Sequence, residues 1–270
     1  MGNEIQLIAM DLDDTLLRHD VSVSDYTKDV LQRAKARGVR LVVATGRMFC
    51  AARPWGRAIG VGDVPMIVYT GSMVARCESG EILAEETLSL PLASEILDAA
   101  HRGGFYVQYY VDDVLYVPYY CEKTEKYEKS CGVRAKVLGE DFWKLPGEPI
   151  KILIFEDDPA RIAEAEWTLV PAFSERAGYA KSTPFFLEFN AKGTTKGRAL
   201  SRLCERWGIS LEHTMTFGNA QNDVSMLSLT PWSFAVANAT AEAKKAAHFE
   251  TASNDEDGVA KAVAKYVLGE

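Results

Sequence analysis

The sequence lacks any apolar run long enough to cross a bilayer, which takes about 20 consecutive apolar residues. Its 270 residues are 47% hydrophobic and 25% charged, the composition of a globular protein with ample material for a core. Basic residues are outnumbered, 30 against 38 acidic ones, so the formal net charge is −8. An acidic surface disfavours nucleic acid and anionic membranes as partners, and an anionic substrate would need local positive groups.

Cysteine and histidine are also sparse. The five cysteines include no Cys-x-x-Cys pair, and the four histidines lie far apart, so no zinc-ligand spacing is present. Scattered cysteines are typical of a reducing compartment. The first ten residues hold no lysine or arginine and do not resemble a secretory signal peptide. We expect a cytoplasmic protein with no nucleic-acid or membrane partner.

Strand-like and helix-like segments alternate at both ends of the chain. Apolar runs predict strands at residues 7–10, 39–44, 66–69, 214–217 and 233–236, and amphipathic runs predict helices at 25–37, 51–59, 196–207 and 241–247. Such alternation is typical of a parallel sheet with right-handed crossovers.

The middle of the chain follows a different pattern. Two aromatic, β-branched runs flank Asp112-Asp113 and predict a hairpin, and further strands are expected at 151–155 and 185–189. A helix is expected from Pro159 to about residue 177, kinked or split at Pro171.

Together the two patterns predict an α/β protein. Residues 1–85 and 189–270 would form a Rossmann-like core with a parallel sheet. Residues 86–188 would form an inserted α+β cap, mostly antiparallel, that determines substrate specificity.

The predicted core strands end in polar residues, and the first strand does so most abruptly. Asp11 directly follows the apolar run 7–10, and Asp13 comes two residues later. Residues i and i+2 of an extended chain face the same way, so the two carboxylates can converge. They repel each other unless a proton or a hard cation such as Mg²⁺ lies between them. The alternative is that these acids only cap the following helix.

Four segments in order, DLDDTLL, VVATGR, KGTTKGRAL and GNAQNDVSML, resemble the motifs of phosphatases of the haloacid dehalogenase superfamily. The closer similarity is to the Cof-type branch, which carries a large α/β cap between the second and third motifs. The resemblance covers the whole chain. It implies a Mg²⁺-dependent phosphatase acting on a small phosphorylated metabolite, such as a sugar phosphate or a cofactor-like phosphate.

The resemblance also implies catalytic roles. Asp11 corresponds to the nucleophile, which forms an aspartyl-phosphate, and Asp13 corresponds to the general acid and base. Lys196 corresponds to the lysine that neutralises the nucleophile and the phosphoryl group. From its charge alone, Lys196 could equally be a surface lysine at a helix start.

Phosphate and metal contacts are implied by the same motifs. The positions that correspond to phosphate-binding residues are Thr45, Gly46, Lys196 and Asn222. Those that correspond to metal ligands are Asp11, Asp13 through its backbone carbonyl, Asn219 and Asp223. For Thr45 and Gly46 the alternative is a simple strand-to-helix turn.

Two positions depart from the family pattern. Asn219 stands where a metal-binding aspartate is usual, and its amide oxygen can bind Mg²⁺ without contributing charge. Thr70-Gly71-Ser72 stands where related chains often have Asn-Gly-Ala. Two other functions stay open: a phosphomutase, and a non-catalytic phosphate-ligand-binding protein with an altered metal site.

Overall fold

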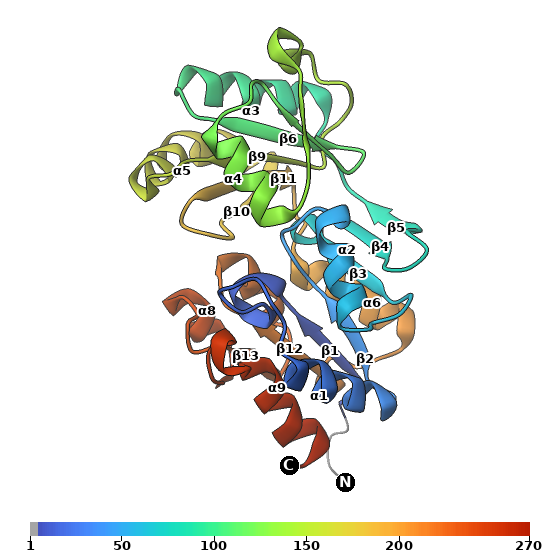
Figure 1. The fold of residues 1–270 in the computed structure, drawn as a ribbon. Helices are drawn as coiled ribbons and strands as arrows, with labels where there is room; N and C mark the ends of the chain where they lie inside the picture. The colour runs from blue at the N-terminus through green and yellow to red at the C-terminus, as the bar shows by residue number, and fades with distance from the viewer. Residues whose placement is uncertain (1–4) are drawn as a thin grey trace. The chain divides into compact units, whose positions relative to one another are not determined.

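The computed structural model describes residues 5–270, and the chain divides into two compact units (Figure 1). The first unit contains the residues up to Gly46, together with Ala52–Leu83 and Thr195–Glu270. The second contains Arg47–Ala51 and Ala84–Thr194. The described N-terminal segment and the C-terminal segment therefore belong to one unit. Within the described residues, no helix has the length and apolar character needed to cross a bilayer.

The first unit is built on a five-stranded sheet in the order β14-β13-β12-β1-β2. Its strands are β1 (Leu7–Met10), β2 (Arg40–Val43), β12 (Thr214–Gly218), β13 (Trp232–Ala235) and β14 (Phe249–Glu250). Every neighbouring pair is parallel, and β1 lies between β12 and β2. The predicted α/β fold with a parallel-sheet core is confirmed.

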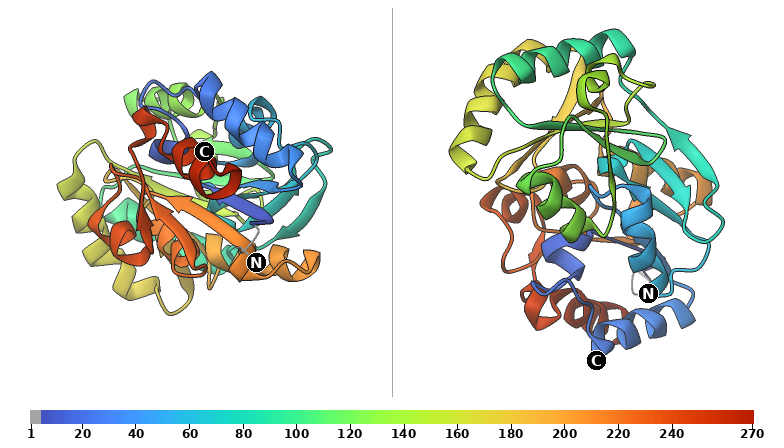
Figure 2. Two further views of the ribbon diagram at one scale, coloured as in Figure 1. Left: turned by 90° about the horizontal axis from the view of Figure 1, so that it is seen from below. Right: turned by 45° about the horizontal axis from the view of Figure 1, so that its top comes forward.

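Helices cover both faces of this sheet (Figure 2). Helices α1 (Asp25–Ala36) and α9 (Gly258–Val263) lie together on one face, and α6 (Lys196–Trp207) lies on the other. The apolar residues Leu200 and Leu203 of α6 share a buried cluster with Leu7, Ala9 and Val42 of the strands. The remaining helices of the chain ends are α2 (Phe49–Ala58), α7 (Val224–Leu227) and α8 (Ala241–Ala246). This packing fixes the strand ends at which the polar motifs begin.

The third predicted strand pairs differently from the expectation. Strand β3 (Pro65–Val68) belongs to a separate three-stranded sheet with β4 (Met73–Arg76) and β5 (Ile82–Glu85). Strands β3 and β4 are antiparallel, and a single parallel bridge from Ala44 to Ile67 links β3 to the end of β2. The chain turns back on itself after β3 instead of crossing over, which the apolar run alone does not indicate.

The second unit contains a six-stranded sheet in the order β10-β11-β9-β6-β7-β8. Its strands are β6 (Val107–Val111), β7 (Val114–Val117), β8 (Ala135–Val137), β9 (Lys151–Phe155), β10 (Ala177–Ala180) and β11 (Phe186–Ala191). All neighbouring pairs are antiparallel except β7 and β8. The hairpin predicted around Asp112-Asp113 is present, and both residues have the positive φ that a tight two-residue turn requires.

Helices α3 (Leu90–Arg102) and α5 (Pro159–Phe173) contribute to the apolar core on one face of this sheet, together with Tyr109 and Phe189. Helix α5 is continuous through Pro171, so it is not split there, and it ends at Phe173 rather than near residue 177. Proline in the last turn removes one backbone hydrogen bond where the helix is about to end, which is tolerated more readily than in its middle.

The opposite face of the same sheet carries several buried polar side chains. Gln108 of β6, Lys151 of β9 and Glu188 of β11 are each no more than 2% exposed. Lys151 Nζ lies 3.4 Å from Glu188 Oε2, and Ser182 Oγ donates to Glu188 Oε1 at 2.6 Å. Gln108 donates through Nε2 to the hydroxyl of Tyr110, while its Oε1 has no hydrogen-bond partner among the described residues. Burying a charged pair carries a desolvation cost that apolar side chains of similar volume do not have. This face therefore differs from an ordinary apolar core.

Candidate active site

Asp11 directly follows β1 at the carboxyl edge of the parallel sheet. Its backbone N–H donates to the carbonyl of Phe217 in β12 at 3.1 Å. The Asp11 side chain accepts no capping hydrogen bond from the turn Leu12–Leu16, so the helix-cap alternative does not hold for it. Instead, Asp11 Oδ1 accepts a hydrogen bond from Lys196 Nζ at 2.7 Å.

Lys196 is the first residue of α6, and its side chain is fully buried. Thr195 caps the helix, because its hydroxyl accepts a hydrogen bond from the backbone N–H of Arg198 at 3.1 Å. Lys196 Nζ donates to Asp11 Oδ1 and to Asp223 Oδ1, both at 2.7 Å. The surface-lysine alternative is therefore wrong, and this lysine joins two motifs that lie far apart in the sequence.

Asp223 ties the lysine to the loop that follows β12. Its Oδ1 accepts from Lys196, and its Oδ2 accepts from the backbone N–H groups of Asn219 at 2.9 Å and Ala220 at 3.1 Å. At Gly218, a Cβ would lie 2.5 Å from the Cβ of Asp223. Only glycine leaves room for this carboxylate, which explains the glycine at the start of GNAQND.

The charges of the site do not balance. Burial raises the pKa of Asp11 most, Lys196 lowers it, and the negative charges of Asp223 and Asp13 raise it again, so that together these effects bring the pKa of Asp11 to about 8. Burial alone would lower the pKa of Lys196, but the carboxylates of Asp11 and Asp223 outweigh it and raise that pKa. One lysine thus faces two acidic side chains, and an additional cation would relieve the repulsion between them.

Two amide side chains complete this edge of the first unit. Thr15 Oγ1 donates to Asn219 Oδ1 at 3.1 Å, so the amide oxygen of Asn219 is held in a defined position. Asn222 is 7% exposed, and its Oδ1 has no hydrogen-bond partner among residues 5–270. A buried oxygen without a partner is costly, and a bound ligand could satisfy it. Sequence reasoning missed Thr15, although it ends the segment DLDDT.

Thr45 and Gly46 follow β2 at the same edge of the sheet. The backbone N–H of Ala44 donates to the Met10 carbonyl at 2.9 Å, which continues the pairing of β2 with β1 up to this point. Thr45 is fully buried, and its N–H donates to the carbonyl of Ile67 at 2.8 Å. The structure therefore brings together the ends of β1, β2 and β12, where the sequence-predicted residues lie.

The oxygen atoms at this edge of the sheet are suitable ligands for a hard cation such as Mg²⁺. The candidate ligands are the carboxylates of Asp11 and Asp223, the amide oxygen of Asn219 and the backbone carbonyl of Asp13, all oxygens of the kind that Mg²⁺ binds. Within the described residues, no three acidic, cysteine or histidine side chains form a metal cluster by themselves. A cation here would therefore also use amide, carbonyl or substrate oxygens. The excess of negative charge around Lys196 supports this fit.

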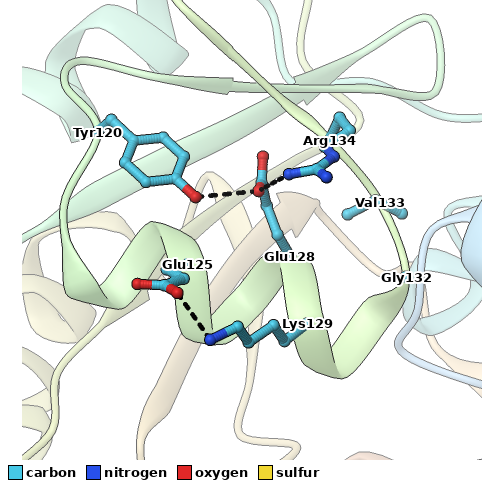
Figure 3. Close-up of a pocket in the computed structure, with 7 residues that line it drawn as sticks. All are labelled: Tyr120, Glu125, Glu128, Lys129, Gly132, Val133 and Arg134. Carbon is cyan, nitrogen blue, oxygen red and sulfur yellow. Dashed lines mark hydrogen bonds and ion pairs between the residues drawn. The ribbon is translucent and has the colours of Figure 1, made fainter.

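The second unit contains a pocket of about 430 Å³ beside α4 (Glu122–Cys131), shown in Figure 3. Its central acid, Glu128, accepts hydrogen bonds from the Tyr120 hydroxyl at 3.2 Å, Arg134 at 3.0 Å and the backbone N–H of Ala135 at 2.7 Å. Burial alone would raise the pKa of Glu128, but these bonds outweigh it and lower that pKa. Because these groups hydrogen-bond to one another, we interpret them as structural contacts that attach the segment after α4 to the helix, and not as a ligand site.

Comparisons with known proteins agree with this arrangement. The family model of haloacid dehalogenase-like hydrolases matches residues 8–263. A Streptococcus pyogenes protein is 28% identical over 266 residues, which cover 98% of this chain and 99% of its own. A 5-amino-6-(5-phospho-D-ribitylamino)uracil phosphatase of Bacillus subtilis is 26% identical over 265 residues, which cover 98% of this chain and 97% of the relative. The solved structure of a haloacid dehalogenase-like hydrolase from Bacteroides thetaiotaomicron has a TM-score of 0.86 at 27% identity. The match covers 97% of this chain and 99% of that one.

The chain belongs to the haloacid dehalogenase-like hydrolases, because the family model spans nearly all of it. The resemblance to Cof-type phosphatases of this superfamily is thereby confirmed, as is the expected enzyme class, a phosphoric monoester hydrolase.

Proposed function

We propose that this hydrolase is a Mg²⁺-dependent phosphatase that cleaves a small phosphomonoester through an aspartyl-phosphate on Asp11. The observation that carries the proposal is the buried Lys196, which bridges Asp11 and Asp223 at 2.7 Å each. A fully buried cation between two carboxylates at the ends of parallel strands is expensive to build. A phosphoryl-transfer site needs this kind of fixed positive charge.

The proposed chemistry has two steps. A carboxylate oxygen of Asp11 attacks phosphorus while the bond from phosphorus to the leaving oxygen breaks, and Asp13 gives that oxygen a proton. Asp13 then takes a proton from water as the water attacks phosphorus, which releases inorganic phosphate and regenerates Asp11. Lys196 offsets the charge of the phosphoryl group in both steps. Thr45, Gly46 and Asn222 would hold the phosphoryl oxygens.

The residues that would hold Mg²⁺ are Asp11, Asp223, Asn219 and the carbonyl of Asp13. When bound, Mg²⁺ offsets negative charge on the phosphoryl group and on the acids around it. Asn219 contributes an oxygen without charge, so the site would hold Mg²⁺ less tightly than one with aspartate there. The hydrogen bond from Thr15 supports this role, because it fixes the oxygen of Asn219.

Substrate specificity is proposed to reside in the inserted segment 86–188, with residues 1–85 and 189–270 as the catalytic core. The name of the Bacillus subtilis relative describes a phosphate on a ribityl chain attached to a heterocycle. We therefore propose a hydroxylated leaving group, either a sugar or a cofactor-like molecule, and a cytoplasmic enzyme.

A screen of phosphorylated metabolites with released phosphate as the readout tests this function. The wild-type protein should release phosphate from at least one sugar phosphate or cofactor-like phosphate, and only with Mg²⁺. Asp11→Asn should release none while keeping its fold, measured by circular dichroism. An isomerised phosphate ester without free phosphate would instead identify a phosphomutase. Binding of phosphate esters without turnover at high Mg²⁺ would identify the non-catalytic alternative, and either outcome would overturn the proposal.

A further inference from the structure

A short turn after β3 has an unusual backbone. Tyr69, Thr70 and Gly71 are consecutive, and all three have positive φ, of 51°, 58° and 101°. Glycine adopts this region freely, but it is disfavoured for a large aromatic residue and for a β-branched one. Tyr69 is fully buried and Thr70 is 3% exposed. Strain of this kind persists only where the surrounding structure enforces it.

One side of the turn holds the end of β2. The backbone N–H of Thr70 donates to the carbonyl of Thr45 at 3.0 Å. The N–H of Thr45 donates in the opposite direction, to the carbonyl of Ile67 in β3 at 2.8 Å. Both backbone groups of Thr45 are therefore fixed by β3 and by the turn that follows it.

The other side of the turn holds the start of α6. At Gly71, a Cβ would lie 2.4 Å from the carbonyl oxygen of Thr195 and 3.1 Å from the backbone nitrogen of Lys196. Beyond Lys196, a Cβ at Gly197 would lie 2.2 Å from the carbonyl oxygen of Ser225 in α7. The backbone of Lys196 is thus enclosed between the turn and α7, and neither side leaves room for a methyl group.

We infer that the turn Tyr69–Gly71 is a positioning element that sets the spacing between Thr45 and Lys196. The inference rests on the proposed function, in which both residues hold the phosphoryl group. The strained backbone is what allows one short turn to hydrogen-bond to Thr45 and to touch Thr195. No residue of the turn needs to contact substrate for this role, so these are positioning residues and not catalytic ones.

The test compares Gly71→Ala with Gly38→Ala, using p-nitrophenyl phosphate and Mg²⁺. Gly38 also has positive φ, of 88°, but a Cβ there would meet nothing within 4 Å. In both variants alanine must adopt a positive φ, which is unfavourable for it, but only in Gly71→Ala must the new Cβ displace Thr195. Because displacements of about 1 Å can cost about 100-fold in rate, kcat per folded protein should fall about tenfold or more in Gly71→Ala. Gly38→Ala should keep the wild-type kcat.

If the two variants have kcat values within about twofold of each other, the positioning role is refuted. Should Gly71→Ala fail to fold, Thr70→Gly serves instead, because it relieves the strain and loosens the turn without adding volume. We then expect kcat per folded protein to fall, and an unchanged kcat would overturn the inference. Absence of phosphate release from the wild-type protein would count against the proposed function, which separates the two failures.

Discussion

Replacing Lys196 with methionine is the substitution whose cost follows most directly from the contacts of the site. Methionine keeps a flexible, unbranched chain but removes the ammonium group. Lys196 Nζ donates both of the 2.7 Å hydrogen bonds to Asp11 and Asp223, and the lysine side chain is fully buried. The variant therefore leaves two buried carboxylates with no cation between them.

The magnitude follows from this loss of charge. Removing one partner of a buried ion pair costs about 3–5 kcal/mol, and we expect Lys196→Met to lower the free energy of unfolding by that amount in EDTA at pH 7. Adding Asp223→Asn should recover about 1 kcal/mol or more, because the amide oxygen can still accept from Asn219 and Ala220 while one buried charge is removed. Mg²⁺ should also recover part of the loss, since it would supply the missing positive charge.

Urea unfolding followed by far-UV circular dichroism measures these differences. Lys28→Met is the matched control, because Lys28 pairs with Asp25 at 3.1 Å on the surface of α1, with the two side chains 41% and 100% exposed. Exposed pairs contribute about 0–1 kcal/mol, so this variant should stay close to wild type. If Lys196→Met lowers the free energy of unfolding no more than Lys28→Met does, Lys196 does not stabilise the buried carboxylates of Asp11 and Asp223 as we propose.

Two further predictions concern other parts of the chain. Asn219→Asp should lower the half-saturating Mg²⁺ concentration for phosphate release, and identical Mg²⁺ titrations of the two proteins would show that residue 219 is not a metal ligand. Burial alone would raise the pKa of Asp257, but hydrogen bonds from Ser24, Arg18 and Thr27 outweigh it and lower that pKa. The stability that this carboxylate contributes is present above its ordinary pKa of 3.8 and is lost as the pH falls below it. Asp257→Asn should therefore cost about 1.5–3 kcal/mol near pH 7 and progressively less below pH 4 in urea unfolding, and a pH-independent cost would refute this.

The sequence predicts the core strands well because each is a continuous apolar run that ends in polar residues. Strands β1, β2, β12 and β13 lie close to their expected positions, and their carboxyl ends meet at one edge. The pairing of β3 was not predictable in this way. Its apolar run is as regular as the others, and nothing in that run indicates that the chain reverses after it and pairs β3 with β4 in a separate sheet.

The motifs predict which residues belong to the candidate site. They do not predict which of these residues contact one another. Nothing local to Lys196 indicates that its side chain is buried, because its partner Asp11 lies 185 residues away in the sequence. The same holds for Thr15, whose bond to Asn219 spans 204 residues. Such contacts depend on how the strands and α6 pack, and hydrophobic periodicity reports only which residues face a core.

Trapping the phosphorylated enzyme tests the central claim most directly. Asp13→Asn should slow the attack of water, while p-nitrophenyl phosphate still transfers its phosphoryl group because its leaving group needs little protonation. Reduction of the quenched enzyme with borohydride converts an aspartyl-phosphate into homoserine, which peptide mass spectrometry locates. We predict homoserine at position 11 only, in the presence of substrate and Mg²⁺. Homoserine at another position, or phosphate release from Asp11→Asn at the wild-type rate, would contradict it.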